Sequence, residues 1–297
     1  MIIPDYLKEG DSIGLISTAR KISLNELNSA VRVLKNWGLK VVLGKHIFSQ
    51  YRQFAGTDLE RKTDFEHMLK NSKIKAILCV RGGYGTVRII DKLEDTLFTS
   101  SPKWIIGYSD VTVIHSHLYN LGIASIHAPM AIDFLTASKQ SLDTLRFLLF
   151  GQQNCIKTKS NKLNREGEIK GEIIGGNLSI LYSLLGSTTD INTSNKILFI
   201  EDLDEYLYHI DRMIINMKRN QKFKKIKGLI VGGMNNMNDN KIKFGKTARE
   251  IIFEHIAEYN FPVCFGFPSG HIKNHMSICF GKESLLKITS KSVVLHQ

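Results

Sequence analysis

A serine follows a short apolar run at the point where the sequence pattern changes from strand to helix. Residues 104–107 read WIIG, which is typical of a buried strand, and Ser109 comes two residues later. From Val111 onward apolar residues recur at helical spacing. Strand, sharp turn and helix are the geometry of a nucleophile elbow, in which the serine hydroxyl stands clear of the backbone and the next amide N–H can face an oxyanion.

A second interpretation of this stretch stays open. The usual elbow reads G-x-S-x-G, and Val111 takes the place of the second glycine. Ser109 or Asp110 could simply cap the helix that follows, because both residue types are good N-caps. The pattern therefore indicates either a nucleophile or a helix cap.

A glycine-rich loop at 81–85 (RGGYG) follows a predicted strand at 75–80. Its three glycines permit unusual backbone angles and a close approach of the backbone to a ligand. The spacing fits neither of the two common phosphate-binding motifs. The loop is either a source of a backbone N–H for an oxyanion, from Gly83 or Gly82, or a plain tight turn.

One histidine is distinguished by its place in the chain. His271 lies in a loop directly after an apolar strand, and loops at strand ends commonly hold catalytic side chains. By contrast, His115 and His117 are two residues apart on a predicted helix, so they point to different faces and cannot chelate one metal ion together.

Ser109, Glu201 and His271 form a possible serine, acid and histidine set in that chain order. Serine is a poor nucleophile at its own pKa, imidazole is a base that titrates near neutrality, and a carboxylate fixes the imidazole tautomer. The pattern alone leaves His275 and Asp202 as alternatives. Taken in isolation, the Glu201–Asp202 pair is expected in an exposed loop at a strand end.

The first half of the chain alternates strands with helices. Strands are expected at 11–16, 40–43, 75–80, 104–107 and 124–127, with helices between them and a last one at 141–150. Such alternation implies crossovers and a parallel, doubly wound sheet. Ligands of such sheets bind beyond the carboxyl ends of the strands, where the glycine loop and the serine turn both lie.

A change in composition marks a domain boundary. Residues 151–168 are rich in Gln, Asn, Lys and Ser and lack apolar periodicity, so we expect domains at 1–155 and 166–297. In the second domain residues 171–179 predict a glycine-rich turn that leads into a helix. Further elements are expected as strands at 196–200, 228–231, 262–266, 277–281, 285–289 and 292–295, with helices at 208–219 and 248–259.

The composition is that of a globular protein with an excess of positive charge. The 297 residues are 43% hydrophobic and 23% charged, with a formal net charge of +12. The lysines between 218 and 246 lack alternating aromatic residues, which favours a solvated basic face over a nucleic-acid site. No signal peptide or membrane span is expected, and four scattered cysteines indicate a reducing cytoplasm without disulfides or a zinc site.

Several motifs together resemble the LD-carboxypeptidase family of serine peptidases, which also contains the microcin-C immunity peptidases. They occur in the family's order over nearly the whole chain, at 81–85 (RGGYG), 106–112 (IGYSDVT), 175–178 (GGNL), 198–202 (LFIED), 208–213 (YHIDRM) and 270–271 (GH). The resemblance implies Ser109 as nucleophile, His271 as general acid and base, and Glu201 as the carboxylate that orients the histidine. It also implies an oxyanion hole made by the backbone N–H groups of Gly83 and Asp110.

The resemblance further implies a flavodoxin-like N-terminal domain, similar to class I glutamine amidotransferases, and a smaller β-rich α/β C-terminal domain that carries the acid and the base. The triad would then form across the domain interface. Family members are cytoplasmic, usually dimeric and need no metal or other cofactor. They remove the terminal D-alanine from peptidoglycan-derived tetrapeptides through an acyl-enzyme.

The resemblance places substrate contacts at Gly82, Tyr84 and Asn177. Arg81 and Arg212 are candidates for binding the substrate carboxylate, since a guanidinium fork matches it, although either could be a structural ion pair. No aromatic insertion of the kind that stacks on a nucleobase occurs near 186–195, which favours a muropeptide over an adenylate. A serine hydrolase of peptidyl or aminoacyl adenylates and a non-catalytic anion-binding protein remain alternatives, and no nucleic-acid or membrane partner is expected.

Overall fold

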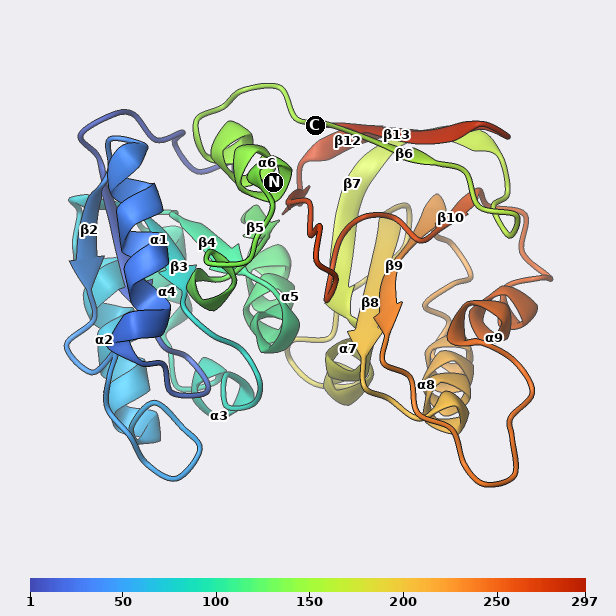
Figure 1. Ribbon diagram of the computed structural model, residues 1–297, viewed down its shortest axis with the longest axis horizontal. Coiled ribbons are helices and arrows are strands. Elements are labelled where there is room, and N and C mark those ends of the chain that lie inside the picture. The colour runs from blue at the N-terminus through green and yellow to red at the C-terminus, as the bar shows by residue number, and fades with distance from the viewer.

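The computed structural model describes residues 1–297 and contains two β-sheets side by side, each with helices packed on it (Figure 1). The first sheet has the order β2-β1-β3-β4-β5-β11. Its strands are β1 (Ser12–Ile16), β2 (Lys40–Leu43), β3 (Ile74–Cys79), β4 (Trp104–Gly107), β5 (Ser125–His127) and β11 (Ile278–Phe280).

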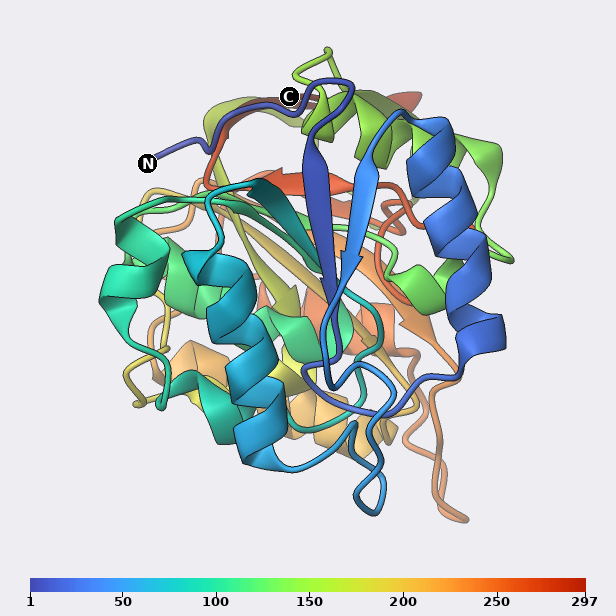
Figure 2. The same cartoon turned by 90° about the vertical axis from the view of Figure 1, so that its left-hand side faces the viewer.

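The first five strands are parallel, as the alternation of strands and helices predicts. Helices α1 (Leu24–Asn36) and α6 (Lys139–Leu149) pack on one face of this sheet, and α2 (Asp58–Lys70) and α5 (Thr112–Asn120) on the other (Figure 2). Because both faces are covered, β3 and β4 are almost wholly buried, which explains their continuous apolar sequences. Two short helices, α3 (Val87–Ile90) and α4 (Asp95–Thr99), complete this half.

The second sheet has the order β10-β9-β8-β7-β12-β13-β6. Four of its strands are parallel, and β12, β13 and β6 continue the sheet in antiparallel pairs. Its strands are β6 (Cys155–Lys159), β7 (Gly167–Asn177), β8 (Ile197–Leu203), β9 (Gly228–Asn235), β10 (Val263–Phe265), β12 (Glu283–Ile288) and β13 (Ser292–His296), and its helices are α7 (Leu178–Leu184), α8 (Leu207–Arg219) and α9 (Ala248–His255).

Two expectations for the second half are wrong in detail, and one strand was not expected. Residues 171–177 belong to the long strand β7 and not to a turn, because Gly175 and Gly176 extend the strand where side chains would collide with its neighbours. The polar stretch after 151 contains the edge strand β6, whose alternate residues face solvent. Glu201 and Asp202 are buried within β8 and do not lie in an exposed loop.

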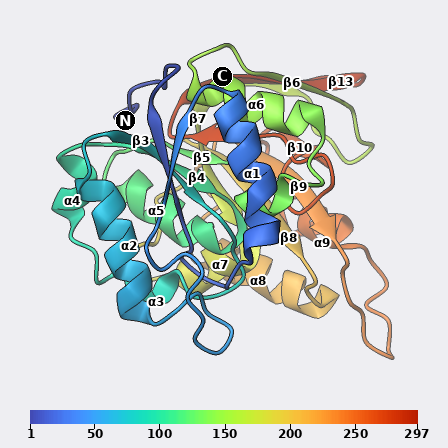
Figure 3. The same ribbon diagram turned by 60° about the vertical axis from the view of Figure 1, so that its left-hand side comes forward.

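The two halves of the chain are joined by more than a linker. Strand β11, from the C-terminal part of the sequence, adds to the first sheet antiparallel to β5. Between the sheets, α5 packs against β7 and α7 (Figures 1 and 3). The carboxyl ends of β3 and β4 therefore face those of β7 and β8 across one seam. None of the helices is long and apolar enough to cross a bilayer.

Candidate active site

The turn after β4 holds Ser109 in a left-handed backbone conformation. Its φ is 61°, a strained value for a residue with a Cβ, and a short 3-10 turn at Ser109–Val111 leads into α5. A Cβ at Gly107 would stand 2.8 Å from a methyl group of Val111. The usual second glycine is therefore replaced by a buried valine that packs against Gly107, and the elbow keeps its shape.

Neither candidate cap residue caps α5. The Ser109 hydroxyl makes no capping hydrogen bond, and the buried Asp110 carboxylate instead accepts a hydrogen bond from the Thr86 N–H at 2.9 Å. Burial raises the pKa of Asp110 despite this contact. The turn thus presents Ser109 to the pocket and uses Asp110 to bind the glycine loop.

The glycine loop after β3 lies against the serine. A Cβ at Gly82 would stand 3.2 Å from the Ser109 Cβ, and Gly83 has a φ of 108° that favours glycine. The Gly83 N–H donates to no group of the chain. A free backbone donor beside the serine is what an oxyanion hole requires.

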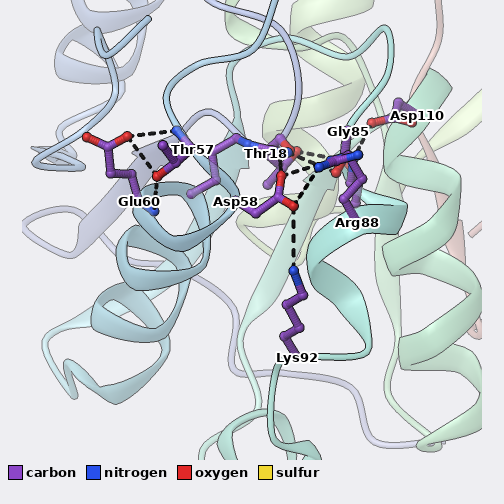
Figure 4. Close-up of polar contacts among 10 residues, drawn as sticks. Thr18, Thr57, Asp58, Glu60, Gly85, Arg88, Lys92 and Asp110 are labelled. Atoms are coloured by element: carbon purple, nitrogen blue, oxygen red, sulfur yellow. Dashed lines mark hydrogen bonds and ion pairs between the residues drawn. The ribbon is translucent and has the colours of Figure 1, made fainter. Parts of the chain in front are cut away.

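A buried arginine holds the loop walls together, and the sequence patterns gave no sign of it. Arg61 on α2 donates from Nη1 to the carbonyl oxygens of Thr18, after β1, and Gly85, after β3. Asp58 contacts Arg61 and also binds Arg88 through two 2.9 Å contacts (Figure 4). Burial lowers the pKa of Arg61, and the Asp58 carboxylate offsets part of that effect.

On the opposite side of the seam, His271 is fixed by Glu201. The His271 Nδ1 lies 2.7 Å from Glu201 Oε2, and the His271 backbone N–H donates to the same oxygen at 3.0 Å. Since a carboxylate only accepts, Nδ1 carries the proton and Nε2 is free to exchange one. A Cβ at Gly270 would stand 2.5 Å from this oxygen, so only glycine lets the carboxylate approach.

The electrostatics of this pair favour the charged imidazole. The Glu201 side chain is 0% exposed and that of His271 is 13% exposed. Burial alone would lower the pKa of His271, but the Glu201 charge and hydrogen bond, with smaller contributions from Asp202 and Asp133, raise it above 6.5. Glu201 therefore both orients the ring and stabilises its protonated form.

Two further histidines lie behind the site and stay neutral. The Tyr108 ring packs between His271 and His275, with ring centroids 4.7 and 4.6 Å apart. His275 Nε2 lies 3.2 Å from His127 Nδ1. Burial, with the nearby His271 charge, lowers the pKa of His275 to about 3, and burial lowers that of His127 well below 6.5. His275, an alternative base on sequence grounds, makes no contact with an acid, unlike His271.

Asn177 joins the two halves of the site. Its backbone N–H donates to the Thr112 hydroxyl on α5 at 3.0 Å, and its side-chain amide donates to Asp202 at 2.9 Å and to Glu201 at 3.4 Å. Its side-chain oxygen caps α7. Burial and the neighbouring Glu201 charge raise the pKa of Asp202 to about 7.

One pocket of about 510 Å³ collects most of the predicted site residues. Those that line it are Arg81, Gly82, Gly83, Ser109, Asp110, Asn177 and His271. Glu201 lies behind His271, whereas Tyr84 packs on Phe54 and Arg212 on Tyr208, both away from the lining.

The pocket also contains residues that sequence reasoning missed. Arg20 lines it from the loop after β1, and Asp204 and Glu205 line it from the end of β8. No hydrogen bond joins the Ser109 hydroxyl to His271, although both line the pocket. Catalytic hydrogen bonds commonly shorten only when substrate binds.

The chain matches two family models in succession. Residues 13–128 match the LD-carboxypeptidase N-terminal domain, and residues 170–286 match the LD-carboxypeptidase C-terminal domain. A Bacillus subtilis (strain 168) protein named probable murein peptide carboxypeptidase is 32% identical over 99% of this chain and 94% of its own length. The microcin C7 self-immunity protein MccF of Escherichia coli is 25% identical over 98% of this chain and 94% of its own length.

The fold agrees with these sequence matches. The crystal structure of muramoyltetrapeptide carboxypeptidase from Oxalobacter formigenes has a TM-score of 0.89 and 26% identity, and the match covers 96% of this chain and 98% of that one. Sequence and fold thus agree over nearly the whole length. The chain belongs to the LD-carboxypeptidase family.

Proposed function

We propose that this protein is a serine-type LD-carboxypeptidase that removes the terminal D-alanine from peptidoglycan-derived tetrapeptides. The single observation that supports this most is the meeting of Ser109 with the His271–Glu201 pair in one pocket, from opposite sides of the seam. The peptidase family and the names of its relatives support the same substrate class.

In the proposed mechanism His271 Nε2 takes the proton of the Ser109 hydroxyl as its oxygen attacks the scissile carbonyl carbon. The Gly83 and Asp110 N–H groups stabilise the resulting oxyanion. The imidazolium then gives its proton to the departing D-alanine amine, and the carbonyl stays bound to Ser109 as an ester. Water, activated by His271, hydrolyses that ester and frees the tripeptide.

The test is D-alanine release from a purified muropeptide ending in D-alanine. Wild-type protein should release it, and Ser109→Ala should lower kcat by about 10⁴-fold or more, because the nucleophile is lost while the oxyanion donors remain. Trapping the acyl-enzyme at Ser109 by mass spectrometry would add direct support. The proposal is contradicted if wild-type protein releases no D-alanine, or if Ser109→Ala has unchanged activity.

A second candidate keeps the same chemistry on a peptidyl or aminoacyl adenylate, as the similarity to the MccF protein suggests. The segment between α7 and β8, residues 185–196, contains no aromatic residue that could stack on a nucleobase. We therefore rank it below the muropeptide. A competition assay with a muropeptide and an adenylate distinguishes the two candidate functions, since the preferred substrate has the larger kcat/KM.

We also propose a fold type for the first domain, the bounds of both domains, a cytoplasmic location and a homodimer. The order β2-β1-β3-β4-β5 is that of flavodoxin-like sheets, which supports a flavodoxin-like domain at 1–155 and a second domain at 166–297, with β11 returning to the first sheet. Four free cysteines suit a cytoplasmic protein. A homodimer with no nucleic-acid or membrane partner is expected, and sedimentation analysis tests the dimer.

A further inference from the structure

The walls of the pocket carry opposite charges. Arg20 and Arg81 line it from the loops after β1 and β3, in the first half of the chain. Across the seam, Asp204 and Glu205 line it directly after β8, beside the buried Asp202. A substrate carboxylate is attracted to the arginine wall and repelled by the acidic one, so the charges orient a bound peptide.

Only one of the two arginines is free of partners within the chain. Arg81 donates from Nη1 to the Lys21 carbonyl oxygen at 3.1 Å and pairs with Glu26 at 3.5 Å. The exposed Arg20 side chain makes no hydrogen bond and no ion pair. An unpaired guanidinium in a substrate pocket can offer both arms of its fork to an incoming carboxylate.

The backbone of Arg20 is nevertheless fixed. Its N–H donates to the Gly82 carbonyl oxygen at 3.4 Å, and it forms an isolated bridge with Phe54. Its side chain lies along Gly83, where an added Cβ would stand 2.5 Å from Arg20 Cδ and 2.7 Å from Nε. The Arg20 side chain therefore passes next to Gly83, the proposed oxyanion donor, on the first-domain wall of the pocket.

We propose that Arg20 binds the terminal carboxylate of the substrate and thereby selects free-acid carboxyl termini. This inference rests on the proposed function, in which the residue that leaves carries both the scissile nitrogen and that carboxylate. The two groups are close in the substrate, as Gly83 and Arg20 are close in the protein. The sequence pointed to Arg81 and Arg212 for this role, but Arg81 is already paired and Arg212 lies outside the pocket.

The experiment compares two substrates that differ only at the carboxyl terminus, a tetrapeptide ending in D-alanine and the same peptide ending in D-alaninamide. Arg20→Met should lower kcat/KM for the acid about 100-fold and change that for the amide less than about 3-fold, because only the acid loses a charged partner. Arg20→Lys, which keeps the charge without the fork, should lose about 10-fold on the acid. Arg219→Met, at an exposed arginine of α8, is the matched control and should change neither value.

Equal losses on acid and amide, or an unchanged value for the acid, would overturn the assignment of Arg20. If wild-type protein cleaves neither peptide, the proposed function fails, and binding of both peptides to Ser109→Ala is then measured by calorimetry. In that case the carboxylate site is still supported if Ser109→Ala binds the acid more tightly than the amide and the double variant with Arg20→Met does not. The assignment of Arg20 is overturned if Ser109→Ala binds acid and amide equally, or if the double variant still binds the acid more tightly.

Discussion

The two sides of the seam hold the proposed nucleophile and the proposed base in opposite ways. Ser109 is positioned by its own backbone, since a φ of 61° between β4 and α5 lifts the side chain out of the turn. His271 is positioned by a partner distant in sequence, because Glu201 binds both its ring and its backbone N–H. The serine is thus positioned by local backbone strain, and the histidine is positioned by hydrogen bonds to a buried carboxylate.

This difference explains how tolerant each side is to change. The elbow keeps its geometry with Val111 in place of a glycine, because a buried valine packs against Gly107. The histidine side has no comparable freedom, since Gly270 leaves just enough room for the Glu201 carboxylate. Substitutions should therefore affect activity through different routes on the two sides.

Apart from loss of the Ser109 hydroxyl itself, the largest effect on activity is expected for Glu201→Gln. It should lower kcat/KM about 1000-fold, because a glutamine no longer stabilises the imidazolium and can favour the wrong tautomer. His271 must be neutral to accept the serine proton, so wild-type activity falls as pH drops below its raised pKa. Without the Glu201 charge, burial lowers that pKa, and the acidic limb of the pH profile moves to lower pH.

Asp211→Asn is the matched control for that experiment. Asp211 lies 2.6 Å from His255 Nε2, a carboxylate–histidine pair outside the pocket. The control should leave both the rate and the acidic limb unchanged. If the acidic limb of the pH profile does not move to lower pH in Glu201→Gln, the proposed role of Glu201 is contradicted.

A smaller effect is expected at the contact that joins the two sides. Thr112→Val keeps the shape of the side chain but leaves the buried Asn177 N–H without its acceptor. The free energy of unfolding should fall by about 1–3 kcal/mol, measured by urea denaturation. Thr112→Ser retains the hydroxyl and should keep a higher kcat/KM than Thr112→Val. The reverse order would mean that this hydrogen bond does not help to align the two sides.

The smallest effect tests the strain at the elbow. Ser109→Gly and Ser109→Ala should both be inactive, but the glycine variant should be about 1 kcal/mol more stable, because glycine adopts a positive φ without strain. At Ser29, in the interior of α1, the order should reverse, since glycine is disfavoured in a helix by about 1 kcal/mol relative to alanine. Equal stability of the two Ser109 variants would show that the elbow stores no strain.

Much of the fold could be predicted from the sequence because it depends on neighbouring residues. The alternation in the first half predicted five strands of a parallel sheet, and all five form it. The prediction of a turn at 171–179 was wrong, because Gly175 and Gly176 lie at the end of strand β7. A strand end and a turn use the same residue type, and only the closeness of Phe199 shows which applies.

By itself, the sequence determined the strand, the turn and the helix around Ser109, since these elements form from contiguous residues. It also determined the family, because the motifs occur in order along the chain. Only the tertiary structure decided that Glu201 is buried behind His271, that Arg61 ties two loops together and that Arg20 remains unpaired in the pocket. Burial and the presence or absence of an ionic partner depend on which distant segments meet, and here the two sheets bring those segments together.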